Sequence, residues 1–143
     1  SLDGNGKMSK SENQMSTIYL DDEPELVRKK IMKAKTDNGP KTPFAEKPDY
    51  IENLFTLMKL VSAADVVKKF ENDFNECSIR YGDMKKQLAE DMVQFLVPIQ
   101  LKMQALQEDQ EYLKKVMATG AEKARASAQA TLQKVKKAMA LVY

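Results

Sequence analysis

The chain has 143 residues, with 23 basic and 21 acidic side chains, one cysteine and no histidine. Without histidine it cannot supply a Ser-His-Asp or Cys-His catalytic pair, a zinc site built on imidazole, or an imidazole acid or base at neutral pH. The single cysteine cannot form an internal disulfide, and no apolar run approaches the ~20 residues that a membrane-spanning helix needs, so we expect a cytoplasmic protein with no metal site and no membrane contact.

The first 20 residues contain two lysines within a stretch of small residues. Gly4 and Gly6 precede Lys7, and Lys10 follows three positions later. In such a loop the ammonium groups and the backbone N–H groups can converge on phosphate oxygens, which suits a polyphosphate ligand. For two lysines alone, an ordinary solvated loop is the commoner structure.

The spacing of apolar residues predicts four to six helices and almost no strand. Asp22 and Pro24 make a helix start, and the helix that follows carries an apolar face. Residues 36–49 contain Gly39 and three prolines and therefore predict a connector. The apolar positions of this first helix are Leu26, Val27, Ile31 and Ala34.

Two helices of similar length are predicted next. Asp49 can cap the first, and Ser62 with Asp65 three residues later is typical of a capping box for the second. We interpret Cys77 as a core residue on the apolar face of the second helix. The apolar positions are Ile51, Leu54, Phe55, Met58 and Val61 in the first, and Val66, Phe70, Phe74 and Cys77 in the second.

The longest predicted helix begins near Asp83, and we expect a kink at Pro98 because proline removes a backbone hydrogen bond. A short helix is expected to end at Gly120, followed by an alanine-rich helix. The predicted fold is an all-α, antiparallel helical bundle over residues 21–143, with a short irregular segment before it. The apolar positions of the longest helix are Leu88, Met92, Phe95, Ile99, Met103 and Leu106.

Charge is segregated along the chain. Residues 28–41 hold six basic residues and one acidic residue, and residues 112–143 hold seven and one. A basic terminal helix can follow a phosphate backbone, although a solvated face of an alanine-rich helix is the commoner explanation of the charge alone. Tyr81 and Tyr112 could stack on unpaired bases. The candidate RNA contacts are Lys114, Lys115, Lys123 and Arg125.

The pentapeptide Lys7-Met8-Ser9-Lys10-Ser11 resembles the nucleotide-closing signature loop of class I aminoacyl-tRNA synthetases. Residues 16–37 resemble the segment after that loop in tryptophanyl-tRNA synthetases, and tyrosyl enzymes share parts of it. Residues 81–85 and 120–125 look like the tail of the bacterial-type tryptophanyl enzymes. The resemblance covers nearly the whole chain.

The resemblance implies that the intact enzyme is a homodimer that activates tryptophan with ATP and Mg²⁺ and transfers it to tRNA(Trp). Lys7, Met8, Ser9, Lys10 and Ser11 would bind ATP, with Lys10 and Lys7 catalytic. A lysine that moves onto the departing pyrophosphate stabilises the transition state more than the ground state. The helical bundle would bind the tRNA.

The second class I motif contains histidine, and this chain has none, so it cannot include the part of such an enzyme that carries that motif. We therefore expect a C-terminal part, in which residues 1–20 belong to a truncated Rossmann-like catalytic domain. Residues 21–143 would then form the anticodon-binding domain. Alone, this part is expected to be inactive and to hold no cofactor. Two alternatives stay open, namely a non-catalytic helical module that binds RNA or protein, and the equivalent part of a tyrosyl-tRNA synthetase.

Overall fold

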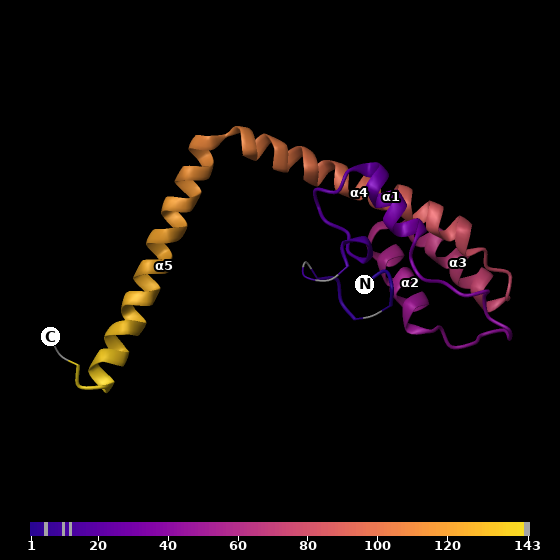
Figure 1. The fold of residues 1–143 in the computed structure, drawn as a ribbon, viewed down its shortest axis with the longest axis horizontal. Coiled ribbons are helices and arrows are strands. Elements are labelled where there is room, and N and C mark those ends of the chain that lie inside the picture. The colour runs from indigo at the N-terminus through magenta and orange to yellow at the C-terminus, as the bar shows by residue number, and fades with distance from the viewer. Residues whose placement is uncertain (5, 10, 12, 142–143) are drawn as a thin grey trace. The chain divides into compact units, whose positions relative to one another are not determined.

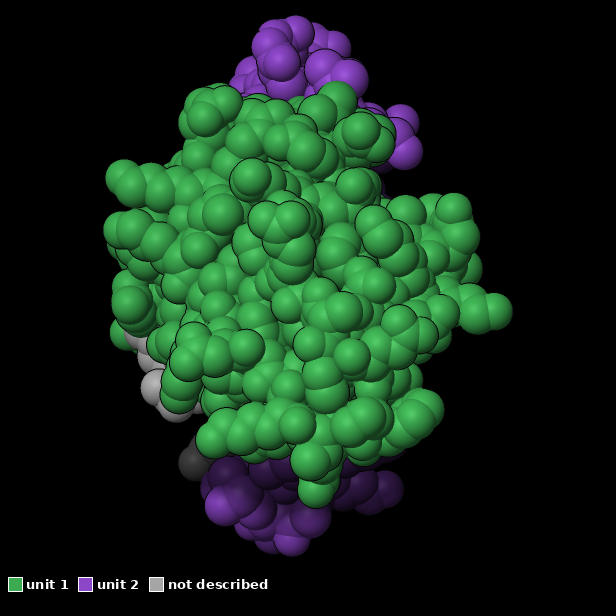
Figure 2. Space-filling model, turned by 90° about the vertical axis from the view of Figure 1, so that its right-hand side faces the viewer, with its two compact units in different colours: residues 1–100 green, residues 101–143 purple. Residues whose placement is uncertain are grey.

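The computed structural model describes residues 1–4, 6–9, 11 and 13–141. Over these residues the chain is all-helical and contains no strand, which confirms the predicted fold class. Two compact units form, residues 1–100 and residues 101–143 (Figure 2). The elements are the 3₁₀ helix η1 (Gln14–Ser16) and the α-helices α1 (Pro24–Met32), α2 (Asp49–Val61), α3 (Ala64–Asn75), α4 (Tyr81–Glu108) and α5 (Gln110–Ala138) (Figure 1).

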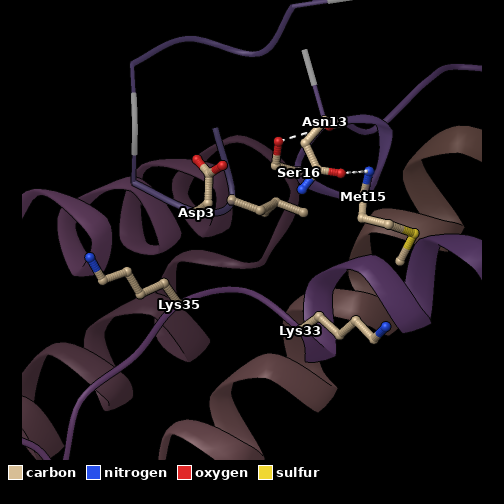
Figure 3. A pocket seen from close by; sticks show the side chains of 7 residues that line it. Asp3, Asn13, Met15, Ser16, Lys33 and Lys35 are labelled. Carbon is tan, nitrogen blue, oxygen red and sulfur yellow. Dashed lines mark hydrogen bonds between the residues drawn. The ribbon is translucent and has the colours of Figure 1, made fainter.

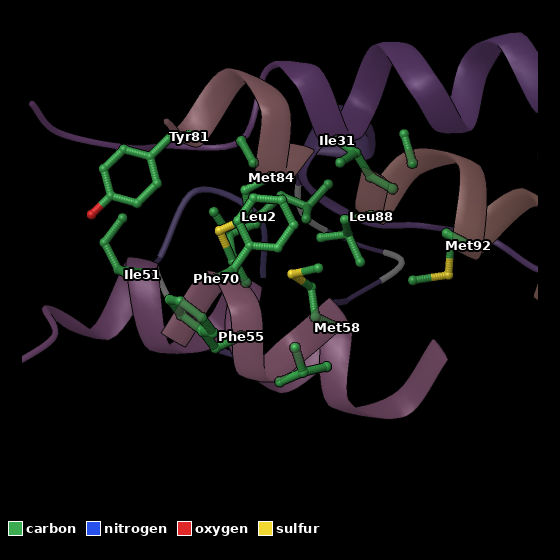
Figure 4. Close-up of a cluster of buried hydrophobic side chains, with 14 of the residues drawn as sticks. Leu2, Ile31, Ile51, Phe55, Met58, Phe70, Tyr81, Met84, Leu88 and Met92 are labelled. Atoms are coloured by element: carbon green, nitrogen blue, oxygen red, sulfur yellow. The ribbon is translucent and has the colours of Figure 1, made fainter. Parts of the chain in front are cut away.

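The hydrophobic core of the first unit is built from α1, α2, α3 and the first part of α4 (Figure 4). Between α2 and α3, the ring of Phe55 packs edge-on against Phe74, with centroids 6.2 Å apart. The N-terminal segment joins this core through Leu2, which is 3% exposed. The other buried apolar side chains are Val27, Ile31, Ala34, Ile51, Leu54, Met58, Val67, Phe70, Tyr81, Met84, Leu88, Ala89, Met92 and Leu96.

Two buried lysines fix the position of α1. Lys30 donates hydrogen bonds of 2.8 and 2.6 Å to the two carboxylate oxygens of Asp22, and both side chains are buried. Lys85 on α4 donates to the backbone oxygen of Ala34 at 2.7 Å, and burial lowers the pKa of its ammonium group. Because a buried charge is costly without partners, these bonds hold α1 and the residues around it in one place.

The predicted core position of Cys77 is wrong. Its side chain is exposed, and its φ of 57° lies in the left-handed region, just beyond the end of α3. Cys77 N donates to Phe74 O and Ser78 N donates to Asp73 O, which are the two bonds of a Schellman motif. The backbone has therefore turned away from the apolar face of α3 before Cys77 is reached.

The predicted helix caps are also wrong. The N-cap position of α2 is Pro48, and Asp49 is already the first helical residue. The N-cap position of α3 is Ala63, because Ser62 closes α2 by donating its N–H to Met58 O at 2.8 Å. The hydroxyl of Ser62 is buried and makes no hydrogen bond within the described part of the chain.

The longest predicted helix is present as α4, whereas the two helices predicted after it form the single helix α5. α4 continues through Pro98, and its residue Phe95 is 47% exposed while Leu96 is buried in its place. α5 continues through Gly120, so the helix end predicted there is wrong. It begins after Asp109, whose carboxylate accepts a hydrogen bond from Tyr112 N. None of the described residues of α5 is buried, and most of its alanines are exposed.

Candidate functional site

The signature loop, residues 7–11, belongs to a longer segment whose two ends are fixed to the helical core. Leu2 N donates to Ser16 O at 3.0 Å, and Leu2 O accepts from Lys35 N at 2.9 Å. The side chains of Leu2 and Ser16 are buried. The segment therefore leaves the core at Leu2 and returns to it at Ser16, beside the residues that follow α1.

Two glycines before the loop adopt left-handed conformations, with φ of 82° at Gly4 and 74° at Gly6. A Cβ atom at Gly4 would lie 2.6 Å from Tyr50 Cβ and 3.3 Å from Tyr50 Cα, at the start of α2. A Cβ atom at Gly6 would have no neighbour within 4 Å. Gly4 is therefore required both for the backbone conformation and for close approach to α2, whereas Gly6 is required for the conformation alone.

Four of the five candidate ATP-binding residues are described. Lys10, the principal catalytic candidate, lies outside the described residues. Lys7 is exposed, whereas Met8 is half-buried and packs against the core. Ser9 O accepts a hydrogen bond of 3.2 Å from the buried hydroxyl of Thr17, and the hydroxyl oxygens of Ser9 and Ser11 are 3.0 Å apart. One side of the loop is thus attached to the core, while the side chain of Lys7 faces solvent.

A pocket of about 350 Å³ lies beside the base of the loop (Figure 3). Lys33 and Lys35 bring positive charge to it, and the sequence pattern had not singled out either residue as a site residue. In Figure 3 the two ammonium groups point away from each other, so they do not converge on one anion. The lining residues are Leu2, Asp3, Asn13, Met15, Ser16, Lys33 and Lys35.

Side chains that could bind a metal are scattered over the part of the chain that the structure describes. Among those residues, no three histidine, cysteine, aspartate or glutamate side chains gather where they could hold a metal ion. Mg²⁺ in nucleotide sites is held mainly by phosphate oxygens and waters, with one or two carboxylates, so it does not require a cluster of this kind. No helix in the same part of the chain is both long enough and apolar enough to cross a bilayer.

The candidate RNA contacts lie on α5. Lys114, Lys115, Lys123 and Arg125 are all exposed. Tyr112 on the same helix is 50% exposed and is accessible for stacking. Arg125 also borders a shallow hollow of about 580 Å³ whose other lining residues are Ala128, Gln129, Thr131, Leu132 and Val135.

The prediction that Tyr81 could stack on an unpaired base is wrong. Tyr81 is only 8% exposed and belongs to the hydrophobic core (Figure 4). Burial, together with the negative charge of Asp37, raises the pKa of its hydroxyl. A nucleobase could not reach this ring without opening the core.

The chain is similar over almost its whole length to known tRNA synthetases. A family model for class I tRNA synthetases (W and Y) matches residues 1–97. The chain is 48% identical to the tryptophan–tRNA ligase of Porphyromonas gingivalis over 135 residues, which is 94% of this chain and 41% of that protein. It is 41% identical to the tryptophan–tRNA ligase of Helicobacter pylori (strain ATCC 700392 / 26695) over 140 residues, covering 95% of this chain and 40% of that protein. The chain thus spans about two fifths of the length of the curated relatives it matches. No solved structure matches the chain significantly.

Proposed function

We propose that this chain supplies the signature loop and the tRNA-binding helices of a tryptophan–tRNA ligase. The chain belongs to the family of class I tRNA synthetases for tryptophan and tyrosine. The complete enzyme would be a cytoplasmic homodimer that activates tryptophan with ATP and charges tRNA(Trp). The observation that carries this proposal is the intact pentapeptide, residues 7–11, within a chain 48% identical to a tryptophan–tRNA ligase.

In the proposed reaction a carboxylate oxygen of tryptophan attacks the α-phosphorus of ATP. A new bond forms between the carboxylate oxygen and the α-phosphorus. The bond between the α-phosphorus and the oxygen that bridges the α- and β-phosphates breaks, and pyrophosphate leaves with the bonding electron pair. Negative charge grows on the pyrophosphate in the transition state, so an ammonium group that reaches it then accelerates the reaction. We assign this role chiefly to Lys10 and a supporting role to Lys7, whose exposed side chain is consistent with it. Magnesium would enter with ATP.

The residues beside these lysines would hold the backbone of the loop close to the nucleotide. Met8 packs against the core, and Ser9 accepts the hydrogen bond from Thr17. Ser9 and Ser11 also bring two hydroxyl groups together, 3.0 Å apart, and Ser11 N donates a long hydrogen bond of 3.4 Å to Ser9 Oγ. Such hydroxyl groups can bind phosphate oxygens without adding further charge.

The test is Lys10→Ala in the full-length ligase. We expect the kcat of tryptophan-dependent ATP–pyrophosphate exchange to fall by about 100-fold, because no ammonium group at this position then stabilises the transition state, with the Kd for tryptophan unchanged. Lys68→Ala, on the exposed face of α3, is the matched control and should keep full activity. An unchanged exchange rate in Lys10→Ala would refute the proposed role.

Two further outcomes separate the alternatives. Exchange that depends on tyrosine rather than tryptophan would identify a tyrosyl enzyme. The isolated 143-residue chain should catalyse no exchange, because it has no histidine for the second class I motif. Measurable exchange by the isolated chain would contradict this division of the active site.

A further inference from the structure

Tyr50 lies where three parts of the chain meet. Its backbone and the first carbon of its side chain lie against Gly4, so closely that no Cβ atom would fit there. The ammonium group of Lys35 lies 4.7 Å from the centroid of its ring. The N–H of the same Lys35 holds Leu2 O, which precedes the signature loop. One residue at the start of α2 thus touches both segments that form the base of the loop.

Asp37 fixes the orientation of Tyr50. Asp37 Oδ2 accepts a hydrogen bond of 3.0 Å from the Tyr50 hydroxyl, and Asp37 Oδ1 accepts one of 2.8 Å from Gly39 N. The second bond holds the carboxylate in a turn in which Gly39 has a φ of 93°. The hydrogen bond to Asp37 also raises the pKa of the Tyr50 hydroxyl, which remains a donor at neutral pH. The ring is therefore held at both ends, by its own helix and by Asp37.

We propose that Tyr50 and Asp37 are positioning residues for the signature-loop lysines. The hydrogen bond between them keeps Tyr50 against Gly4, and the close approach to Gly4 sets where the chain enters Lys7 and the rest of the loop. Because the effect of a charged group on a transition state depends on placement to within about 1 Å, loosening this support lowers turnover while tryptophan binding is unaffected. This inference rests on the proposed role of the loop in tryptophan activation.

The first test uses Tyr50→Phe and Asp37→Asn in the full-length ligase. Each is expected to lower the kcat of tryptophan-dependent pyrophosphate exchange by about tenfold, with the KM for tryptophan unchanged. The loss of activity in the double variant should be smaller than the product of the two single losses, because both changes affect the same hydrogen bond. Tyr19→Phe is the matched control, since that half-buried ring lies 4.6 Å from the ammonium group of Lys30, and it should keep full activity.

The second test uses the two glycines. Gly4→Ala and Gly6→Ala both place an alanine in the left-handed region, but only Gly4→Ala meets Tyr50. We therefore expect Gly4→Ala to lower kcat by about tenfold more than Gly6→Ala. Thermal unfolding of each variant shows whether the helical core persists, and midpoints within a few degrees of the parent protein are expected. Equal losses of kcat from the two alanine variants would contradict the positioning role.

The outcomes distinguish this inference from the proposed function. If Lys10→Ala abolishes exchange while Tyr50→Phe and Asp37→Asn keep full kcat, the loop is catalytic and the positioning role is wrong. If Tyr50→Phe raises the KM for tryptophan and leaves kcat unchanged, Tyr50 acts on the amino-acid site and the inference is also wrong. If the unmodified ligase shows no tryptophan-dependent exchange, the proposed function fails, and the positioning role fails with it.

Discussion

Cys77 shows how a single residue can close a helix in an unfavourable conformation. It occupies the left-handed position after α3 that glycine or asparagine usually fills, with φ of 57°. For a residue with a Cβ atom this conformation costs about 1 kcal/mol or more. The side chain is exposed, so no packing interaction offsets that strain. The hydrogen bonds of the Schellman motif impose the conformation in spite of its cost.

Replacing this cysteine by glycine should therefore stabilise the chain. We expect Cys77→Gly to raise the free energy of unfolding by about 0.5–1 kcal/mol, which is the relieved strain less the greater entropy of glycine in the unfolded chain. Urea denaturation followed by circular dichroism would measure the change. Cys77→Ser, which keeps the Cβ atom, should stay close to the parent, and a glycine variant less stable than the serine variant would count against this explanation.

At the scale of the helices, α1 and α4 are joined by a forked ion pair between residues far apart in sequence. Arg28 donates hydrogen bonds of 2.7 and 2.9 Å to the two carboxylate oxygens of Glu90. These bonds from Arg28 lower the pKa of Glu90 below its ordinary value of 4.5. When folding lowers the pKa of a carboxyl group, the group stabilises the folded state fully at pH values above its unfolded-state pKa. This stabilisation is lost as the pH falls through the lowered pKa of the folded state.

Acid titration of stability tests this link. We expect Glu90→Gln to be less stable than the parent near pH 7, with a difference that shrinks below pH 4.5 as Glu90 of the parent becomes protonated. Urea denaturation at several pH values would measure both proteins. Glu46→Gln, at an exposed position in the connector, is the control and should follow the parent. A difference that stays constant into the acid range would show that the charge of Glu90 is not responsible.

The helices themselves were predictable from sequence, and so was the start of α1 at Pro24, but several other helix ends were not. Ile51, Leu54 and Phe55 are buried as their spacing predicts, because apolar residues three or four positions apart lie on one face of a helix. The helix start predicted at Ser62 and the helix end predicted at Gly120 were wrong. A capping interaction contributes only about 1 kcal/mol, and the packing and hydrogen bonding of neighbouring residues can outweigh it.

The candidate site was predictable to the same partial degree. The pentapeptide could be recognised because its residues are contiguous. Tyr50 and Asp37 could not be found in this way, since only the folding of α2 and of the segment after α1 brings them beside Gly4. No short sequence pattern connects these three residues.

At the scale of the whole molecule, one of the two basic segments of the sequence lies in its last 32 residues. Residues 112–143 carry seven basic residues and one acidic residue, and none of the described residues of α5 is buried. All the described basic side chains of that helix are thus open to a polyanion. The predicted domain boundary between residues 20 and 21 stays a prediction. Leu2, from the N-terminal side of that boundary, is buried in the same core as residues of α1 to α4.

The salt dependence of tRNA binding tests the role of this charge. We expect full-length ligase with Lys114, Lys115, Lys123 and Arg125 all replaced by Gln to bind tRNA(Trp) more weakly. The slope of log K against log salt should fall by about 0.7–0.9 for each phosphate that is no longer neutralised. Fluorescence anisotropy between low and moderate salt would measure the slope. Lys68→Gln, on α3, should leave it unchanged, and a quadruple variant with the parental slope would exclude α5 from phosphate binding.

The fixed ends of the segment from Leu2 to Ser16 have one more consequence. Because the Leu2 N–H is bonded to Ser16 O, the segment is an Ω-loop closed by the core. The entropy of a closed loop varies only with the logarithm of its length, so even doubling the number of residues costs about 0.6 kcal/mol. Insertions or deletions between the two anchors would therefore cost little in loop closure, and their main effect would be to displace Lys7 from its place relative to Gly4 and Met8. The length of this loop and the packing of the helical core are therefore separate properties, which evolution or design can change independently.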